Sequence, residues 1–196
     1  MDVEPAFWSG RRVLVTGHTG FKGSWLSLWL AQMGAEVTGV SDSVPTSPSL
    51  FSLARIGELV ETVEADVRDA EAIAAAVRQH RPEVVLHLAA QALVRPSFRD
   101  PRTTYEINVM GTVNVLDAVR LSDGVRAVVN VTSDKCYENR EWEWAYREEE
   151  PMGGKDPYSA SKGAAELVTA AYRRSYFSEE GGTRLASAGR VTPSAP

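Results

Sequence analysis

The chain has 196 residues, of which 43% are hydrophobic and 24% are charged, a composition typical of one soluble globular domain. Its 21 Lys and Arg residues against 26 Asp and Glu residues give a net charge of −5, which does not favour nucleic-acid binding. The longest strongly apolar stretch, 25–33, is too short to span a membrane, and the acidic N-terminus lacks a signal segment. Cys136 is the only cysteine in the sequence. We therefore expect a cytoplasmic protein with no membrane or nucleic-acid partner and no metal site, since His18, His80 and His87 lack ligand neighbours.

Short apolar runs alternate with longer amphipathic stretches along the chain. The runs are dense in branched aliphatic residues, as in strands buried on both faces of a parallel sheet, and the longer stretches have helical spacing. In chain order, the predicted elements are a strand at 12–16, a helix at 22–33, strands at 36–40 and 60–66, a helix at 69–79, a strand at 84–88, a helix at 103–121, a strand at 127–132, a helix at 157–176 and a strand at 183–187. This alternation predicts an α/β fold with a Rossmann-like, doubly wound parallel sheet.

A glycine-rich turn joins the first predicted strand to the first predicted helix. It has the spacing G-x-x-G-x-x-G and reads Gly17-His18-Thr19-Gly20-Phe21-Lys22-Gly23. Glycine is needed where such a turn bends tightly, approaches a pyrophosphate and packs helix on strand, and the helix N-terminus then faces the anion. Glycine triplets also occur in turns without a ligand, but this position between strand and helix predicts a dinucleotide site.

The ends of the second and third predicted strands bear on the choice of cofactor. An acid that binds the ribose is expected about 20 residues after the turn. Ser41 stands at that position and Asp42 follows one residue late, which leaves the preference between NAD and NADP open. Asp66, after the third strand, has two interpretations: a hydrogen bond to the adenine, or an acid at the N-terminus of the next helix.

Small and polar side chains follow the fourth and fifth predicted strands. The segment 87–91 has small residues that would let a cofactor lie across the sheet, or that would simply allow close helix packing. Ser133, Asp134 and Lys135 follow the fifth strand. Because ligands of parallel sheets bind at the carboxyl ends of the strands, these three predict a proton-handling cluster; a hydrophilic strand-to-loop transition is the alternative.

The helix at 157–176 places Tyr158 and Lys162 on one face, four residues apart. A phenol has a pKa of about 10, so it is a poor base at neutral pH. Lowering that pKa by about 3 units requires roughly 4 kcal/mol, which one cation at about 4 Å supplies in a medium of effective dielectric near 20. Such pairs also occur on surfaces, but downstream of a dinucleotide turn this pair predicts an acid–base site.

Together these residues resemble the extended short-chain dehydrogenase/reductase family. The turn at 16–23, the strand end at 87–90 and the Tyr158–Lys162 pair carry that resemblance. Three longer strings, at 21–26, 132–139 and 156–159, are similar to the CDP-glucose 4,6-dehydratase branch, in which lysine stands at the position of Lys135. The resemblance covers residues 7–177.

The resemblance implies an NAD-dependent enzyme that converts CDP-glucose to CDP-4-keto-6-deoxyglucose and water. Tyr158 would take the proton of the sugar 4-hydroxyl while hydride passes to NAD, and Lys162 would lower the tyrosine pKa and hold the nicotinamide ribose. Ser133 would hydrogen-bond the 4-oxygen, Asp134 would protonate the leaving 6-oxygen, and Lys135 would assist proton transfer at C5. Hydride would then return to C6. The product would serve deoxysugar biosynthesis for the lipopolysaccharide O-antigen.

The implied contacts lie at the glycine turn and at the strand ends. The cofactor contacts are Gly17, Thr19, Gly20, Phe21, Lys22, Gly23, Asp66, Val67, Leu88, Ala89, Ala90, Thr132, Tyr158 and Lys162. The sugar contacts are Gln91, Ser133 and Asp134. Lys135 has a structural alternative, an ion pair with Glu138 or Glu141.

Members of this family are generally longer and carry a C-terminal lobe that grips the nucleotide. The resemblance therefore implies a truncated chain, with an NAD-binding domain at 1–178, a divergent tail at 179–196 that includes a possible sixth strand, and most of the substrate lobe missing. It also implies a homodimer through the helices at 103–121 and 157–176. Two alternatives stay open: another nucleotide-sugar enzyme of this family, either an epimerase or a different 4,6-dehydratase, and a non-catalytic NAD-binding fragment. Asp134 and Lys135 argue against an epimerase, because epimerisation needs no acid for the 6-hydroxyl.

Overall fold

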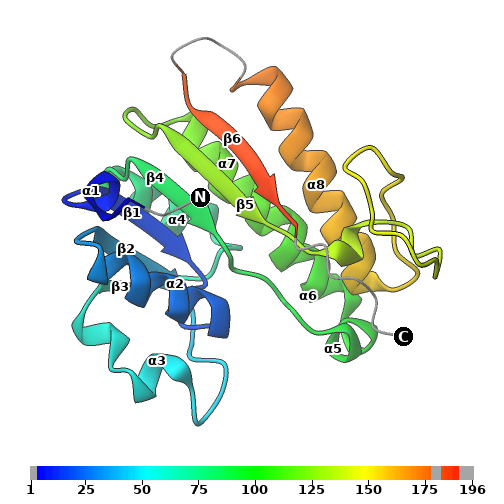
Figure 1. Ribbon diagram of the computed structural model, residues 1–196, viewed down its shortest axis with the longest axis horizontal. Helices are drawn as coiled ribbons and strands as arrows, with labels where there is room; N and C mark the ends of the chain where they lie inside the picture. The colour runs from blue at the N-terminus through cyan, green and yellow to red at the C-terminus, as the bar shows by residue number, and fades with distance from the viewer. Residues whose placement is uncertain (1–3, 178–181, 190–196) are drawn as a thin grey trace.

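Six parallel strands form one sheet in the computed structural model, which describes residues 4–177 and 182–189 (Figure 1). The sheet order is β3-β2-β1-β4-β5-β6. From the centre of the sheet, β1 to β3 extend it in one direction and β4 to β6 extend it in the other, so the strand order reverses between β1 and β4. The strands are β1 (Arg12–Thr16), β2 (Glu36–Ser41), β3 (Glu61–Glu64), β4 (Val84–His87), β5 (Ala127–Val131) and β6 (Arg184–Ala188). This is the doubly wound, Rossmann-like arrangement that the alternating pattern predicts.

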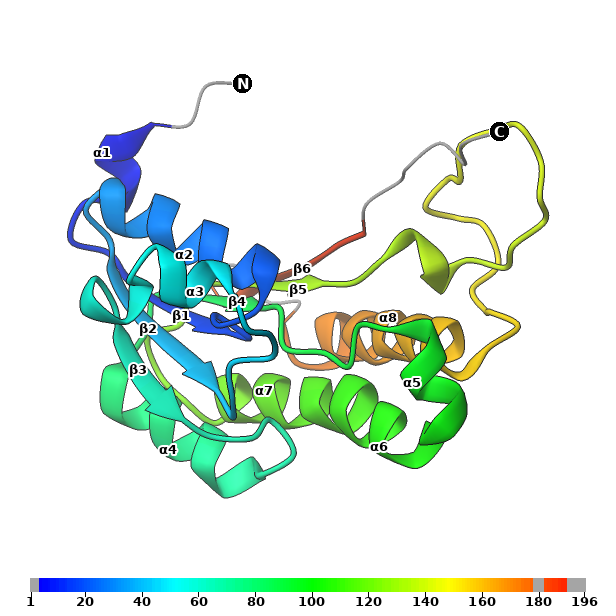
Figure 2. The same ribbon diagram turned by 90° about the horizontal axis from the view of Figure 1, so that it is seen from below.

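Helices cover both faces of the sheet, as Figure 2 shows. One face carries α1 (Pro5–Trp8), α2 (Phe21–Gln32) and α3 (Leu50–Leu53), followed by the 3₁₀ turn Ile56–Glu58. The opposite face carries α4 (Ala70–His80), α7 (Gly111–Arg120) and α8 (Pro157–Ser175), with α5 (Val94–Arg99) and α6 (Pro101–Tyr105) beside α8. The short 3₁₀ turn Asp134–Cys136 follows β5.

Two apolar cores, one on each side of the sheet, hold the helices in place. Successive residues of a strand point to opposite faces, so in β1 Leu14 packs toward α4 and α7 while Val13 and Val15 pack toward α2. All three side chains are at most 1% exposed. Burial of this kind stabilises by about 1.5–3 kcal/mol for each aliphatic side chain.

Acidic caps start three of the helices on the second face. Asp69 accepts backbone N–H bonds at the start of α4, Asp100 at the start of α6 and Asp156 at the start of α8. Helix α2 differs, because its N-cap is Gly20, which has no side chain to accept those bonds. The first N–H groups of α2 therefore remain without a side-chain cap.

All ten predicted elements are present, and their ends differ from the predictions by at most two residues. The prediction of one continuous helix at 103–121 was wrong in one respect: the π-helical turn Glu106–Met110 separates α6 from α7. The helices α1, α3 and α5 were not predicted, because four to six residues are too few to show a period. Within the expected tail at 179–196, the possible sixth strand is present as β6, which pairs with β5 over five residues. The rest of that tail, at 179–181 and 190–196, and the boundary at 178–179 lie outside the described residues.

Candidate functional site

A cavity of about 650 Å³ lies beyond the carboxyl ends of the strands, beside the point where the sheet order reverses. The glycine turn, the ends of β2, β3, β4 and β5 and the start of α8 make its wall. Every residue predicted to contact the cofactor lines it, and so does Gln91. Ser133, Asp134 and Lys135 are not part of the lining. The remaining lining residues include several that the sequence analysis did not single out: Ser43, Pro45, Thr46, Ala65, Ala92, Leu93, Ile107 and Val131.

The glycine turn leaves no room for a side chain at Gly17 or at Gly23. Gly17 has a φ of +73°, and a Cβ there would lie 2.7 Å from the backbone nitrogen of Ala89. A Cβ on Gly23 would collide with the carbonyl oxygen of Gly17. The amide of Gly20 donates to that same carbonyl at 3.1 Å, which closes the turn. The turn therefore brings bare backbone and the start of α2 to the cavity, as an anionic pyrophosphate requires.

The end of β2 presents Asp42, not Ser41, to solvent. The Ser41 hydroxyl lies 3.0 Å from Nδ1 of the buried His18, and the residue is 8% exposed. Burial lowers the pKa of His18, so the imidazole is neutral at pH 7. Both Ser41 and Asp42 line the cavity, but the hydrogen bond turns the serine inward. The carboxylate of Asp42 is thus the exposed acidic group that follows β2 on the cavity wall.

Asp66 is not the cap of the following helix. Asp69 accepts the first N–H bonds of α4, while Asp66 accepts the backbone N–H and the Nε of Arg68, both at 2.8 Å. The Arg68 guanidinium holds the pKa of Asp66 below its usual range. This geometry rules out the capping interpretation and leaves an ionised carboxylate on the cavity wall.

A buried hydrogen-bond network supports the end of β4. The Thr16 hydroxyl accepts the N–H groups of Leu88 and Ala89, both at 3.2 Å, and lies 2.7 Å from Nδ1 of His87. Because Thr112 donates its own proton to a carbonyl, His87 Nε2 donates to the Thr112 hydroxyl at 3.2 Å. The Thr16 proton then goes to Nδ1. The sequence indicated the strand end but not this network, since its members come from three elements.

The buried imidazole makes stability depend on pH. Burial, with the charge of Lys162 as a second cause, lowers the pKa of His87 from 6.5 to about 3. The unfolded chain binds a proton at His87 below pH 6.5 and the folded chain does not, so stability falls as the pH falls from 6.5 toward 3. This group alone is expected to remove about 2 kcal/mol of unfolding free energy between pH 6.5 and pH 5. Urea unfolding at both pH values measures it, and His87→Gln should lose that share of the slope; an equal slope in the variant contradicts the assignment.

Tyr158 and Lys162 reach the cavity from the first two turns of α8. They are 8% and 6% exposed and line the cavity together. The amide of Tyr158 donates to the Ser97 hydroxyl at 3.1 Å, and its carbonyl accepts the Ser161 hydroxyl at 2.6 Å. The backbone of α8 is thereby fixed at the residue that carries the phenol.

The electrostatics of this pair differ from the simple two-charge expectation. Burial raises the pKa of Tyr158, and a hydrogen bond with Ser133 opposes that change. Burial, followed by repulsion from Lys22, lowers the pKa of Lys162 to about 8, with Glu166 opposing. The chain's own groups therefore do not produce the lowered phenol pKa that the sequence analysis expected from Lys162.

Ser133, Asp134 and Lys135 follow the end of β5, and two of them, Ser133 and Asp134, interact with the phenol of Tyr158. Ser133 caps the 3₁₀ turn, and its hydroxyl donates to Asp134 at 3.0 Å. Ser133 and Asp134 are half-buried, whereas Lys135 is exposed. Within residues 4–177 and 182–189, no ion pair joins Lys135 to Glu138 or Glu141, and Glu138 pairs with Arg140.

Glu166 is a neighbour of the site that the sequence analysis missed. Its carboxylate accepts a short hydrogen bond from the hydroxyl of Thr132, which lines the cavity. It lies one helical turn beyond Lys162 on α8, and that spacing of four residues was its only sequence signal. The acid therefore supports both the end of β5 and the charge of the buried ammonium.

Among residues 4–177 and 182–189, no helix is both long enough and apolar enough to cross a membrane. The same residues contain no group of three or more His, Cys, Asp or Glu side chains placed to hold a metal ion.

Comparisons with known proteins connect this arrangement to a family. The model of the family described as GDP-mannose 4,6 dehydratase matches residues 14–180. A curated CDP-glucose 4,6-dehydratase of Salmonella typhimurium is 55% identical over 94% of this chain and 53% of its own length. The crystal structure of the UDP-glucose 4-epimerase of Thermus thermophilus in complex with NAD superposes with a TM-score of 0.73 at 33% identity, covering 85% of this chain and 52% of that one. The UDP-glucose 4-epimerase of Thermotoga maritima, solved with UDP-glucose, has a TM-score of 0.76 at 26% identity, over 85% and 52% of the two chains. The chain thus spans about half the length of the relatives it matches.

Proposed function

Because the chain belongs to the family of GDP-mannose 4,6 dehydratases, we propose that it binds NAD and converts CDP-glucose to CDP-4-keto-6-deoxyglucose and water. One observation carries the proposal: a single cavity joins the glycine turn to Tyr158 and Lys162. The identity of 55% to the Salmonella typhimurium protein supports CDP-glucose as the substrate. In this role the chain would act in the cytoplasm, in deoxysugar biosynthesis for the O-antigen.

The residues present fit the cofactor. A Cβ at Gly17 or at Gly23 would occupy the space beside the glycine turn. Because both residues lack one, the backbone of the turn is available to the pyrophosphate. Asp42 would take the ribose hydroxyls, which favours NAD over NADP because a 2′-phosphate would meet a carboxylate. Lys162 would hold the nicotinamide ribose, and Asp66 would accept from the adenine amino group. When bound, NAD supplies a hydride acceptor at C4 of the sugar and a hydride donor at C6.

The chain's own residues then handle the protons. Tyr158 would take the proton of the 4-hydroxyl, whose oxygen Ser133 would hold by a hydrogen bond. Oxidation at C4 acidifies the C5 proton, and Lys135 would assist its removal and the return of a proton to C5 when hydride reaches C6. Asp134 would protonate the departing 6-oxygen, so that water leaves. Gln91, on the cavity wall, would contact the sugar.

Purified protein incubated with CDP-glucose and NAD tests the proposal, read by the alkali-induced absorbance of a 4-keto-6-deoxy sugar. We expect product with CDP-glucose and little with UDP-glucose or GDP-mannose as matched controls. NAD binding is measured separately by calorimetry. NAD binding without product would overturn the proposed dehydratase activity and identify a dinucleotide-binding protein without turnover. A 4-epimer as the product would identify an epimerase.

Lys135→Ala is expected to slow water elimination by about 100-fold, the lower end of what a positioned acid or base contributes. Oxidation at C4 should change less than elimination, because Lys135 is exposed and lies outside the cavity that holds the phenol. Single-turnover reactions separate the two steps by the transient appearance of reduced cofactor. Equal loss of both steps, or no loss of either, would count against a role for Lys135 at C5.

We also propose that two copies associate through α6–α7 and α8. These helices expose large apolar residues that a partner would cover, among them Met110 at 50% and Leu167 at 63% exposed. The remaining exposed apolar residues on and just beyond these helices are Tyr105, Leu121 and Tyr176.

A further inference from the structure

The hydroxyl of Ser133 joins three groups at the end of β5. It donates to Oδ1 of Asp134 at 3.0 Å, and it accepts the backbone N–H of Lys135 at 3.3 Å. It is also hydrogen-bonded to the phenol of Tyr158. A serine hydroxyl has one proton to donate and two lone pairs that accept, so these three contacts use its whole capacity. Because the Ser133 proton points to Asp134, the neutral phenol is the donor in its bond with Ser133.

The two ends of this chain of hydrogen bonds have linked tasks in the proposed function. Tyr158 would take a proton from the sugar 4-hydroxyl, and Asp134 would give one to the departing 6-oxygen. Carboxyl groups have an ordinary pKa of about 4, so at pH 7 a carboxylate needs a supply of protons before it can act as an acid. The phenol, once it has taken its proton, has to lose it before the next turnover. One transfer from the phenol to the carboxylate meets both needs.

We propose that Ser133 relays this proton from the phenol of Tyr158 to Asp134, which passes it to the leaving 6-oxygen. The inference rests on the proposed function, and it adds the route that joins the two proton steps. While C4 is oxidised, the Ser133 hydroxyl can turn its proton to the 4-oxygen, because rotation about Cβ–Oγ moves no other atom of the chain. Once the phenol holds the proton, the hydroxyl takes the direction that the structure shows, toward Asp134.

Each bond that the relay breaks is matched by one that it forms. The O–H bond of the phenol breaks as one forms at Oγ of Ser133, and the original Ser133 O–H bond breaks as one forms at Oδ1 of Asp134. That proton moves to the 6-oxygen as the C6–O bond breaks and its electron pair leaves with the oxygen. The electron pair of the broken C5–H bond forms the C5–C6 double bond. The proton of the 4-hydroxyl thus becomes one hydrogen of the water, and the phenolate and the carboxylate are restored.

The end points of the relay make the transfer favourable. A phenol has an ordinary pKa of about 10 and water has one of about 15.7, so a proton that passes from a phenol to a departing hydroxide moves to the stronger base. A carboxylate is a weaker base than either, so the carboxyl group carries the proton only while the C6–O bond breaks.

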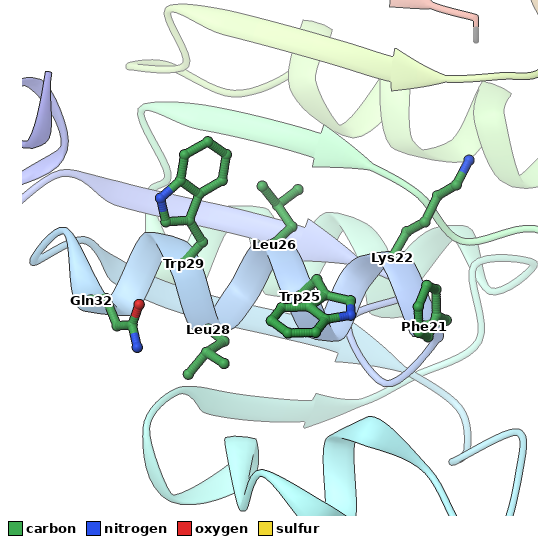
Figure 3. Close-up of a pocket in the computed structure, with 7 residues that line it drawn as sticks. All are labelled: Phe21, Lys22, Trp25, Leu26, Leu28, Trp29 and Gln32. Carbon is green, nitrogen blue, oxygen red and sulfur yellow. The ribbon is translucent and has the colours of Figure 1, made fainter. Parts of the chain in front are cut away.

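The other neighbours of the phenol favour this direction of transfer. Tyr158 is 8% exposed, so bulk water has little access to it. Burial lowers the pKa of Lys162 only to about 8, so at pH 7 its amine already holds a proton and accepts no other. Lys22, the second cation on the cavity wall, extends from the first turn of α2, as Figure 3 shows, and an ammonium group has no acceptor. Ser133, by contrast, accepts a proton and leads to a carboxylate.

A titration of the phenol tests the relay without cofactor or substrate. The phenolate absorbance of the unchanged protein, minus that of Tyr158→Phe, gives the pKa of Tyr158. Asp134→Asn is expected to lower this pKa, because the carboxylate no longer competes with the phenolate for the Ser133 proton. In a Ser133→Ala background the same substitution should lower it less than half as much. The titratable groups around the phenol are Asp134 and Cys136 in the 3₁₀ turn and Asp156 and Lys162 at the start of α8.

Asp156→Asn is the matched control for this titration. Asp156 also raises the pKa of Tyr158, but its carboxylate is bonded to Ser159 and not to Ser133. Asparagine caps a helix as well as aspartate does, so the start of α8 is preserved. This substitution is expected to lower the pKa equally with and without Ser133. Circular dichroism at each pH confirms that the variants are folded. An Asp134→Asn effect of the same size in both backgrounds overturns the relay.

Single turnovers with CDP-glucose and NAD test the relay in the reaction itself. Ser133→Ala and Asp134→Asn are each expected to slow water elimination by about 100-fold. Because both break one route, the double variant should be no slower than the slower single variant, and Ser133→Thr, which keeps the hydroxyl, should stay within about tenfold of the unchanged rate. Losses that multiply in the double variant overturn the relay.

The two experiments separate the relay from the proposed function. Equal titration effects in a protein that forms product overturn the relay and leave the dehydratase activity standing. A titration effect that depends on Ser133, in a protein that forms no product, supports the proton route and overturns the dehydratase activity.

Discussion

Tyr158→Phe is expected to lower the rate of 4-keto-6-deoxy sugar formation by about 1,000-fold, while NAD affinity stays within a few-fold of the unchanged protein. The substitution removes only the phenol oxygen, the group proposed to take the 4-hydroxyl proton. A positioned acid or base contributes about 10²–10⁴-fold to rate, which sets the size of the loss. The ring itself is 8% exposed and remains in place, because its backbone is held by Ser97 and Ser161.

The comparison of rate with binding distinguishes a lost base from a disturbed fold. Calorimetry measures NAD affinity, and the absorbance assay measures turnover in the same preparations. Tyr172→Phe is a matched control, because this tyrosine lies on the same helix and its hydroxyl contacts Asp117 at 3.3 Å, outside the cavity. Turnover by Tyr158→Phe within tenfold of the unchanged protein would remove Tyr158 from the proton step.

The structure also indicates what the phenol still requires before it can act as a base. The prediction from the sequence weighed the charge of one lysine against the ordinary phenol pKa of about 10 and took no account of burial. In the fold, burial raises the pKa of Tyr158 and lowers that of Lys162 to about 8. Burial opposes the charged form of both groups, so the pair alone cannot make the phenol basic. A positively charged nicotinamide in the cavity would lower the pKa of the phenol, and we propose that the base depends on the cofactor for this reason.

The sheet was predictable because its strands contain little besides branched aliphatic residues. Val13, Leu14 and Val85 are buried on either face of a parallel sheet, and that burial is what produces an unbroken apolar run. The glycine turn was predictable for a related reason, since Gly17 and Gly23 occupy positions that tolerate no side chain. Residues whose type is imposed by local backbone or by two-sided burial can be recognised without the fold.

The supporting residues could not be found in this way, because their roles depend on contacts between distant segments. Thr16 and His87 are 71 residues apart in the sequence. The hydroxyl of Thr132, after β5, donates a hydrogen bond to Glu166 on α8. The π-helical turn places Asn108 in hydrogen-bond contact with Gln91 and Ser161. No local sequence pattern predicts this turn. For helix α2, the spacing of apolar residues correctly predicts a helix. The same spacing does not show that the aromatic side of the helix faces outward.

Gly17→Ala is expected to weaken NAD binding by at least about 100-fold, or 2.7 kcal/mol, and to destabilise the fold. Two costs combine at this position. A φ of +73° disfavours any residue with a Cβ by about 1–2 kcal/mol, and the new methyl group would lie 2.7 Å and 2.8 Å from the backbone N and Cα of Ala89. Backbone cannot rotate away as a side chain can, so relief requires the glycine turn and the end of β4 to separate, at a further cost of about 1–3 kcal/mol. Both segments line the cofactor cavity, and their separation would move the amides that are proposed to face the pyrophosphate.

Gly10→Ala separates the two costs. Gly10 has nearly the same conformation, with a φ of +68°, but a Cβ there meets nothing within 4 Å. Its substitution should therefore cost only the backbone term of about 1–2 kcal/mol and leave NAD affinity unchanged. Urea unfolding gives the stability of both variants, and calorimetry gives their affinities. If Gly17→Ala lost no more stability than Gly10→Ala and still bound NAD as tightly as the unchanged protein, the close approach of the turn to Ala89 would have no part in forming the site.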